Sequence, residues 1–212
     1  MNDKTRIAEI LLDLKAVSPS PMNPFTWASG MRSPIYCDNR LIISNVKARR
    51  AVIAAFVRLL ENLEVAPEVV AGTATAGIPH AAWLAESLSL PMIYVRSSEK
   101  KHGKQNRIEG KLNQGAKVIV IEDLISTGGS SVSAARGIQE AGGEVLGVVA
   151  IFQYGMDRAR NTFGEAGIAY DTLTDLATLL DVAVEKGYLT GAEKVLMAEW
   201  RLDPAAWSEK HG

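Results

Sequence analysis

One segment near the middle of the chain constrains the fold more than any other. The apolar run at 118–121 is mostly β-branched, which is typical of a strand that a parallel sheet buries on both faces. Glu122 and Asp123 follow directly, and residues 124–130 then form a Gly/Ser/Thr-containing loop before a helical pattern. Because ligands of open parallel sheets bind beyond the carboxyl ends of the strands, this segment predicts a binding site at that edge.

The acids and the loop are expected to bind different parts of one ligand. A Gly/Ser/Thr loop at a helix N-terminus presents backbone N–H groups and a favourable dipole to a phosphate. Since carboxylates repel phosphate, Glu122 and Asp123 are expected to bind hydroxyl groups or a metal. Together they predict a phosphorylated sugar, with ribose hydroxyls on the acids and the 5′-phosphate on Ser126 to Ser130, hereafter the signature loop. The alternative is an ordinary glycine-rich turn, and the acid pair argues against it.

Composition narrows the classes of function. The 212 residues fit one domain with an appendage, and 47% apolar with 22% charged residues is the balance of a soluble globular protein. A net charge of −1 gives no global attraction to nucleic acid or to anionic membranes. The single cysteine, Cys37, excludes an intramolecular disulfide and a cysteine-cluster metal site. Residues 1–15 lack the apolar core of a signal peptide, and no apolar run approaches the roughly 18 residues of a membrane span, so we expect a cytoplasmic protein.

Apolar periodicity predicts alternating strands and helices over most of the chain. The expected helices are 3–16, 46–63, 77–88, 131–141 and 157–166, and the expected strands are 25–27, 34–37, 69–72, 92–95, 117–123, 145–152 and 168–173. Such alternation indicates βαβ units and a parallel sheet that helices cover on both faces. The remainder, 175–212, is expected to be helical, with a capping box from Thr190 to Glu193.

A second informative segment is the polar loop that follows the strand at 92–95. Five basic residues and a histidine lie in the stretch that begins at Arg96 and ends at Arg107, with both arginines counted. Connections this long are uncommon unless they are functional or disordered. The alternative is a solvated basic loop, but the phosphate loop elsewhere favours a lid whose cations stabilise a negatively charged leaving group.

Four motifs resemble the type I phosphoribosyltransferases, and two of them resemble the orotate phosphoribosyltransferases in particular. Residues 118–130 resemble the signature for phosphoribosyl pyrophosphate (PRPP), without the spacing of a Walker loop or a dinucleotide fingerprint. Residues 71–79 resemble the pyrophosphate loop of the same superfamily. The orotate-specific likenesses are the catalytic loop (Tyr94–Arg96, Lys100, His102–Gly103 and Ile108–Gly110) and the N-terminal hood (Phe25–Thr26, Ser29–Gly30, Ser33–Pro34 and Tyr36).

The resemblance implies the type I phosphoribosyltransferase fold, in which helices flank a parallel sheet beside a small N-terminal hood. It divides a single domain into a hood mainly at 1–45, a core at about 46–175 and C-terminal helices at 175–212. It also implies a cis peptide near Ala74–Thr75. The implied assembly is a homodimer in which each lid reaches into the partner's active site, with no nucleic-acid or membrane partner.

The resemblance also implies roles for individual residues. The catalytic residues would be Lys100, His102 and Asp123. The PRPP-binding residues would be Thr75, Arg96, Lys100, Lys101, His102, Lys104, Glu122, Asp123, Leu124, Ile125, Ser126, Thr127, Gly128, Gly129 and Ser130. The orotate-binding residues would be Tyr36, Cys37, Ser126 and Arg158. Mg²⁺ would be held mainly by PRPP oxygens and water, with no protein residue as a metal ligand.

The implied reaction joins orotate to PRPP and gives orotidine 5′-monophosphate and pyrophosphate, a step of pyrimidine biosynthesis. The chain departs from many members at Ala28, Ala76 and Ser97, where lysine is usual, and this places more weight on the cations of the lid. One alternative is a purine phosphoribosyltransferase of the same fold, against which the hood and lid argue. The other is a non-catalytic PRPP-sensing regulator, which usually needs a nucleic-acid-binding module that neither length nor charge supports.

Overall fold

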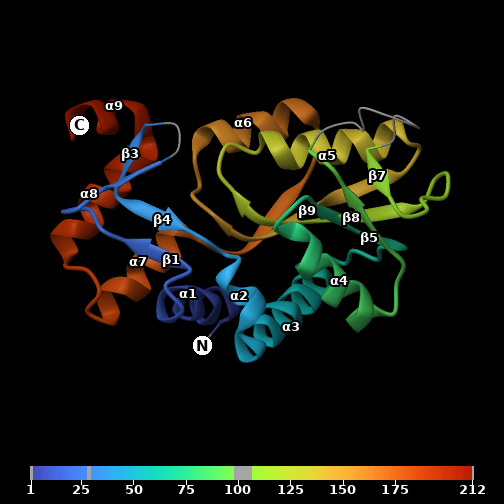
Figure 1. Ribbon diagram of the computed structural model, residues 1–212, viewed down its shortest axis with the longest axis horizontal. Helices are drawn as coiled ribbons and strands as arrows, with labels where there is room; N and C mark the ends of the chain where they lie inside the picture. The colour runs from blue at the N-terminus through green and yellow to red at the C-terminus, as the bar shows by residue number, and fades with distance from the viewer. Residues whose placement is uncertain (1, 28–29, 98–106, 212) are drawn as a thin grey trace.

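A mostly parallel sheet forms the centre of the computed structural model, which describes residues 2–27, 30–97 and 107–211 (Figure 1). Within these ranges the sheet has six strands in the order β10-β9-β8-β5-β6-β7. The strands are β5 (Val69–Thr73), β6 (Met92–Val95), β7 (Ile108–Glu109), β8 (Lys117–Ile125), β9 (Glu144–Gln153) and β10 (Tyr170–Asp175). Only the β6–β7 pair among them is antiparallel. The predicted fold class is therefore confirmed.

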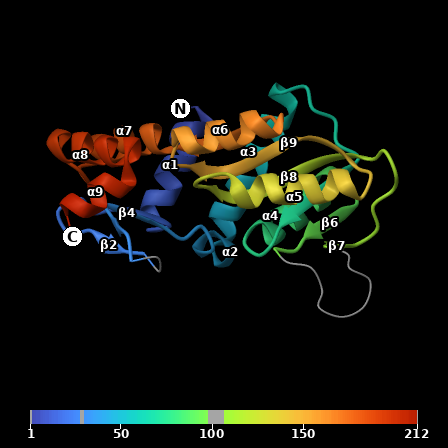
Figure 2. The ribbon, with the colours of Figure 1, turned by 90° about the horizontal axis from the view of Figure 1, so that it is seen from above.

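Helices cover both faces of the sheet, as the two perpendicular views show (Figures 1 and 2). One face carries α5 (Gly129–Glu140) and α6 (Asp157–Ala166), and the other carries α1 (Asp3–Asp13), α3 (Val46–Asn62) and α4 (Gly77–Leu88). The central strand β8 contributes side chains to both faces of the sheet, because successive side chains of a strand point to opposite faces. Val118 and Val120 join the cluster beneath α5, whereas Ile119 and Ile121 join the cluster around α3 and α4.

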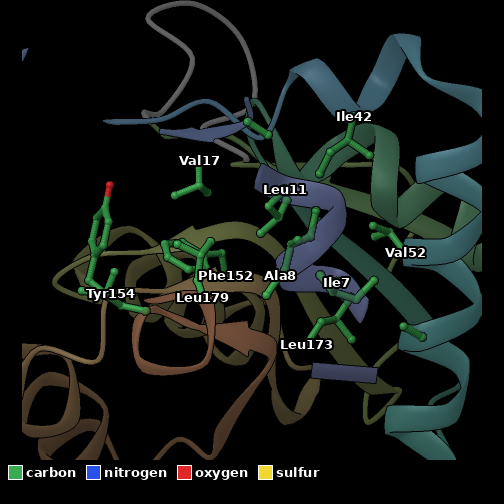
Figure 3. Close-up of a cluster of buried hydrophobic side chains, with 14 of the residues drawn as sticks. Ile7, Ala8, Leu11, Val17, Ile42, Val52, Phe152, Tyr154, Leu173 and Leu179 are labelled. Atoms are coloured by element: carbon green, nitrogen blue, oxygen red, sulfur yellow. The ribbon is translucent and has the colours of Figure 1, made fainter. Parts of the chain in front are cut away.

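The N-terminal helix α1 belongs to the larger of these two cores. Its residues Ile7, Ala8 and Leu11 are fully buried and point toward Leu173 of β10 and Leu179 of α7 (Leu176–Glu185), as Figure 3 shows. Burial of a large aliphatic side chain contributes roughly 1.5–3 kcal/mol. The helix therefore fixes the start of the chain against the β10 edge of the sheet.

The short strands after α1 form the hood. Strand β1 (Val17–Pro19) pairs antiparallel with β4 (Ile35–Cys37), and β2 (Phe25–Thr26) pairs antiparallel with β3 (Arg32–Ser33). The short helix α2 (Leu41–Ser44) then leads into α3. Strand β1 was not expected, because three residues ending in proline carry little periodic signal.

The C-terminal helices pack beside the hood (Figure 1). Helix α8 (Gly191–Leu202) begins with the predicted capping box: Glu193 donates its backbone N–H to the Thr190 hydroxyl at 3.2 Å and accepts from the Thr190 N–H at 2.8 Å. Helix α9 (Pro204–Lys210) follows after a single residue. The backbone N–H of Arg32 in β3 donates to the Ser208 hydroxyl of α9 at 2.8 Å. This bond joins two segments that lie 176 residues apart in the sequence.

Candidate active site

Glu122 and Asp123 lie near the carboxyl end of β8, in the centre of the sheet. The side chain of Glu122 is buried and accepts a hydrogen bond from the Ser131 hydroxyl of α5 at 3.1 Å. Its other oxygen accepts from the backbone N–H of Asp123, also at 3.1 Å. The Asp123 carbonyl in turn accepts from the side-chain amide of Asn39 at 2.7 Å, which ties the strand end to the segment of the hood that follows β4.

The burial of the acid pair changes its ionisation. Burial, reinforced by the charge of Asp123, raises the pKa of Glu122 to about 8. Burial also raises the pKa of Asp123. Because two buried carboxylates this close do not both ionise readily, the pair binds a proton more readily than free carboxyl groups do. A ligand that donates hydroxyl groups or brings positive charge would favour the ionised form.

The signature loop connects β8 to the N-terminus of α5. Gly128 occupies the N-cap position with a φ of +81°, and an added Cβ would lie 2.9 Å from the Phe163 ring, so glycine is required there. In the described part of the chain no side chain caps this helix. Its first backbone N–H groups therefore remain available to an anion such as a 5′-phosphate.

Two predicted PRPP residues, Leu124 and Ile125, lie in strand β8 just before the signature loop. Strand β8 continues to Ile125, two residues beyond the expected end, and Leu124 and Ile125 pair with Phe152 and Gln153 of β9. The Ile125 side chain is buried in the core, so only its backbone could contact a ligand. Gly129 and Ser130 belong to the first turn of α5 rather than to the loop.

The pyrophosphate loop, residues 74–76 between β5 and α4, lies beside the acid pair. The peptide bond between Ala74 and Thr75 is cis, as the family resemblance implies. An added Cβ at Gly77 would lie 2.4 Å from the carbonyl oxygen of Ile121, which precedes Glu122. This close approach requires glycine and brings Thr75 to the same edge of the sheet as the acids.

The structure shows only the base of the predicted lid. Arg96 follows β6, and its guanidinium forms an ion pair with Glu109 at 3.3 Å. Arg107 donates to the Arg96 carbonyl and to the Ser133 hydroxyl of α5, at 3.0 Å for the latter. The predicted lid residues Lys100, Lys101, His102 and Lys104 lie outside the described residues.

The hood brings Cys37 close to Asp123. Tyr36 is 43% exposed, and its ring lies 5.6 Å from that of Phe25. Burial, together with the Asp123 charge, raises the pKa of the Cys37 thiol far above its usual range. Cys37 is therefore a neutral packing residue rather than a nucleophile.

Tyr154 lies close to the acid pair, although the sequence analysis did not select it. It directly follows β9, is 3% exposed, and packs its ring edge-on against Trp200 at 5.3 Å. Burial, together with the charge of Asp123, raises its pKa. Its position after a neighbouring parallel strand was the available signal, since the ends of β8 and β9 meet at one edge. The predicted Arg158 lies further on, exposed in the first turn of α6, where it lines a cavity with Ser126.

The chain was compared with known proteins. The model of the phosphoribosyl transferase domain matches residues 42–175. The orotate phosphoribosyltransferase of Listeria innocua is 49% identical over 209 residues, which cover 99% of this chain and 100% of the relative. The chain belongs to the orotate phosphoribosyltransferase family.

Other members of the orotate phosphoribosyltransferase family agree with this assignment. The enzyme of Halalkalibacterium halodurans is 50% identical over 205 residues, covering 97% of this chain and 98% of the relative. The crystal structure of orotate phosphoribosyltransferase from Aeropyrum pernix superimposes with a TM-score of 0.74 at 26% identity, covering 86% of this chain and 99% of that one. The match spans the hood, core and C-terminal helices together, so the family resemblance extends beyond the PRPP signature.

Proposed function

We propose that the chain transfers the 5-phosphoribosyl group of PRPP to N1 of orotate, producing orotidine 5′-monophosphate and pyrophosphate in pyrimidine biosynthesis. The observation that supports this most strongly is the placement of Glu122 and Asp123 between a phosphate-binding helix N-terminus and the hood. The 49% identity to a full-length orotate phosphoribosyltransferase supports orotate as the acceptor.

Three segments of the site bind different parts of PRPP. Backbone N–H groups at the start of α5 bind the 5′-phosphate. The carboxylates of Glu122 and Asp123 accept hydrogen bonds from the ribose 2′- and 3′-hydroxyls. The pyrophosphate loop, with Thr75, faces the pyrophosphate. Binding in this way favours the ionised form of the acid pair, because hydroxyl donors stabilise carboxylates.

The chemical step is a displacement at ribose C1′. The N1–C1′ bond forms as the bond from C1′ to the pyrophosphate oxygen breaks, and positive charge develops on the ribose ring. Glu122 and Asp123 offset that charge from the ribose side. Lys100 and His102 of the lid stabilise the departing pyrophosphate and exclude water that would hydrolyse the activated sugar.

The donor set fits a Mg²⁺ ion that arrives with PRPP. Among the described residues no group of three or more His, Cys, Asp or Glu side chains is arranged to hold a metal. We expect Mg²⁺ to arrive with PRPP because this ion prefers water and substrate phosphates to an all-protein cage. When bound to PRPP the ion neutralises charge on the leaving group.

We also propose a homodimer in which the lid of one subunit completes the active site of the other.

In the described part of the chain no helix is both long and apolar enough to cross a membrane. The cytoplasmic location and the absence of a nucleic-acid partner stay predictions from the sequence.

Release of pyrophosphate from PRPP and Mg²⁺ tests the proposal with different acceptor bases. We expect turnover with orotate, and none above background with adenine, guanine or hypoxanthine. Turnover with a purine base would support the purine alternative instead. Binding of PRPP without turnover of any base would support a regulator.

A further inference from the structure

A cavity of about 220 Å³ lies where four segments of the chain meet. It is smaller than the roughly 300–1,000 Å³ pockets that accept drug-sized ligands, and therefore suits a single ring. The hood, the signature loop, the loop between β9 and α6, and residues 201–205 at the joint of α8 and α9 all contribute to it. Its lining includes Trp27, Ser126, Thr127, Arg158, Arg201 and Asp203.

The C-terminal helices hold two sides of this cavity in place. The Arg201 guanidinium donates to the Gly155 carbonyl, which precedes α6, at 3.0 Å. Trp200 is fully buried, and its ring packs edge-on against Trp27 of the hood at 5.9 Å and Tyr154 at 5.3 Å. The α8–α9 joint therefore sets the spacing between the hood and the β9–α6 loop.

The arginines of the cavity have donors that an anion could use. Arg158 and Arg201 line it together with Asp157 and Asp203. Both aspartates already have partners, since Asp157 pairs with Arg160 and Asp203 caps α9 by accepting from the Ala206 N–H at 3.0 Å. The Arg201 guanidinium has five N–H donors, and its bond to the Gly155 carbonyl uses one of them. A carboxylate is the natural ligand for the remaining donors, because a guanidinium binds it through two parallel hydrogen bonds.

We propose that Arg201 binds the carboxylate of orotate in this cavity, together with Arg158, and thereby selects an acidic pyrimidine over a neutral one. The inference rests on the proposed function and deepens it. It makes the C-terminal helices part of the acceptor site, with Ser126 and Thr127 joining that site to the PRPP side. The anionic acceptor is then recognised by a residue far from the signature loop in sequence.

Steady-state kinetics of Arg201→Gln tests the proposal. We expect the KM for orotate to rise by roughly 10- to 100-fold, the size of a lost charge-assisted contact, while the KM for PRPP changes less than about threefold. Arg136→Gln, an exposed arginine on α5 away from the cavity, is the control and should match the wild type. The neutral carboxamide analogue of orotate, used as a competitive inhibitor, should bind wild type and Arg201→Gln about equally.

The carboxamide separates recognition from a merely structural role. If Arg201 only positions Gly155, orotate and the carboxamide will weaken together, and the proposal is wrong. An unchanged KM for orotate in an active Arg201→Gln enzyme also overturns it. If the wild type shows no turnover with orotate, the proposed function itself fails and the inference fails with it.

A second variant keeps the test decisive if Arg201→Gln does not fold. Asp203→Asn removes a negative charge from the cavity while retaining a good N-cap for α9. We expect its preference for orotate over the carboxamide to increase by about threefold, the size of one partly exposed charge interaction. An unchanged or reduced preference would contradict an anion site at this position.

Discussion

Glu122 and Asp123 have different partners although they are neighbours in sequence. The buried Glu122 is fixed by Ser131, whereas Asp123 is fixed through its carbonyl by Asn39. The side chain of Asp123 is the more exposed of the two. A ligand can therefore reach Asp123 more readily than Glu122.

Asp123→Asn keeps the size of the side chain and removes its charge. We expect PRPP affinity to fall by roughly 10- to 100-fold, because a hydrogen bond to a charged acceptor is lost, and orotate affinity to fall less. Calorimetric titration measures both affinities. Asp181→Asn, at an exposed position paired with Lys194, is the control. Normal PRPP affinity and turnover in Asp123→Asn would remove the role assigned to this carboxylate.

His80 makes the stability of the fold sensitive to acid. It is fully buried in α4, neither ring nitrogen has a hydrogen-bond partner among the described residues, and burial lowers its pKa to about 4. Below its usual pKa of about 6.5 the unfolded chain binds a proton that the folded chain does not, so this residue makes stability fall as the pH drops from 6.5 toward 4. Above 6.5 it has no such effect.

His80→Leu removes this proton linkage at a similar side-chain volume. We expect the difference in unfolding free energy between variant and wild type to shift in favour of the variant by about 2–3 kcal/mol between pH 7.5 and 4.5. Denaturant unfolding at several pH values measures the shift. A difference that stays constant with pH would show that His80 ionises equally in both states.

The sequence alone was enough to identify site residues whose chemistry is unusual for their local pattern. The acid pair and signature loop stood out because two carboxylates and glycines directly follow an apolar run. Tyr154 and Asn39 did not stand out, because an aromatic residue and an amide after a strand are common. Their importance arises from three-dimensional proximity to Asp123.

At the level of elements, the contact between α4 and β8 sets the shape of the PRPP site. Gly77→Ala would place a Cβ 2.4 Å from the Ile121 carbonyl oxygen. We expect a loss of about 1–3 kcal/mol in stability, the usual cost of overpacking, and weaker PRPP binding because Glu122 follows Ile121. Thermal unfolding and calorimetry measure the two effects.

Gly164→Ala in α6 is the matched control for Gly77→Ala. An added Cβ at Gly164 meets no atom within 4 Å, so the variant should gain roughly 0.5–1 kcal/mol from alanine's higher helix propensity. If both variants behave alike, the close approach of α4 to β8 does not constrain the site.

Elements with strong periodicity were predictable, and their ends were less so. Strands β5, β6, β8, β9 and β10 and the Thr190 capping box were expected and are confirmed, whereas β7 was not among the expected strands. Strand β8 continues to Ile125 because pairing with β9 favours an extended backbone beyond the acids. Such an extension depends on a partner strand and leaves no local signal in the sequence.

For the whole molecule, the packing of the C-terminal helices against the hood could not have been predicted from local patterns. The bond between Arg32 and Ser208 joins residues 176 positions apart, and the C-terminal Trp200 packs on Trp27 in the hood. Helical periodicity predicts that these helices exist but not which surface they cover. This packing brings Arg201 to the site.

The proposed sharing of active sites is tested by mixing Lys100→Ala with Asp123→Asn. If the lid acts in the partner subunit, each heterodimer contains one site with both defects and one with neither. Random re-pairing of equal amounts makes half the dimers heterodimers, so about a quarter of all sites should regain activity. Subunit exchange confirmed by mass spectrometry, without recovery, would exclude the shared-site dimer.

The most direct measurement of the central claim follows the ultraviolet absorbance of orotate in the presence of the purified protein. We predict that the orotate spectrum changes only when PRPP and Mg²⁺ are both present, with one pyrophosphate released for each orotate consumed. The Asp123→Asn protein should show a much smaller rate under the same conditions. A folded wild-type protein that leaves the orotate spectrum unchanged with both reactants present would contradict the account.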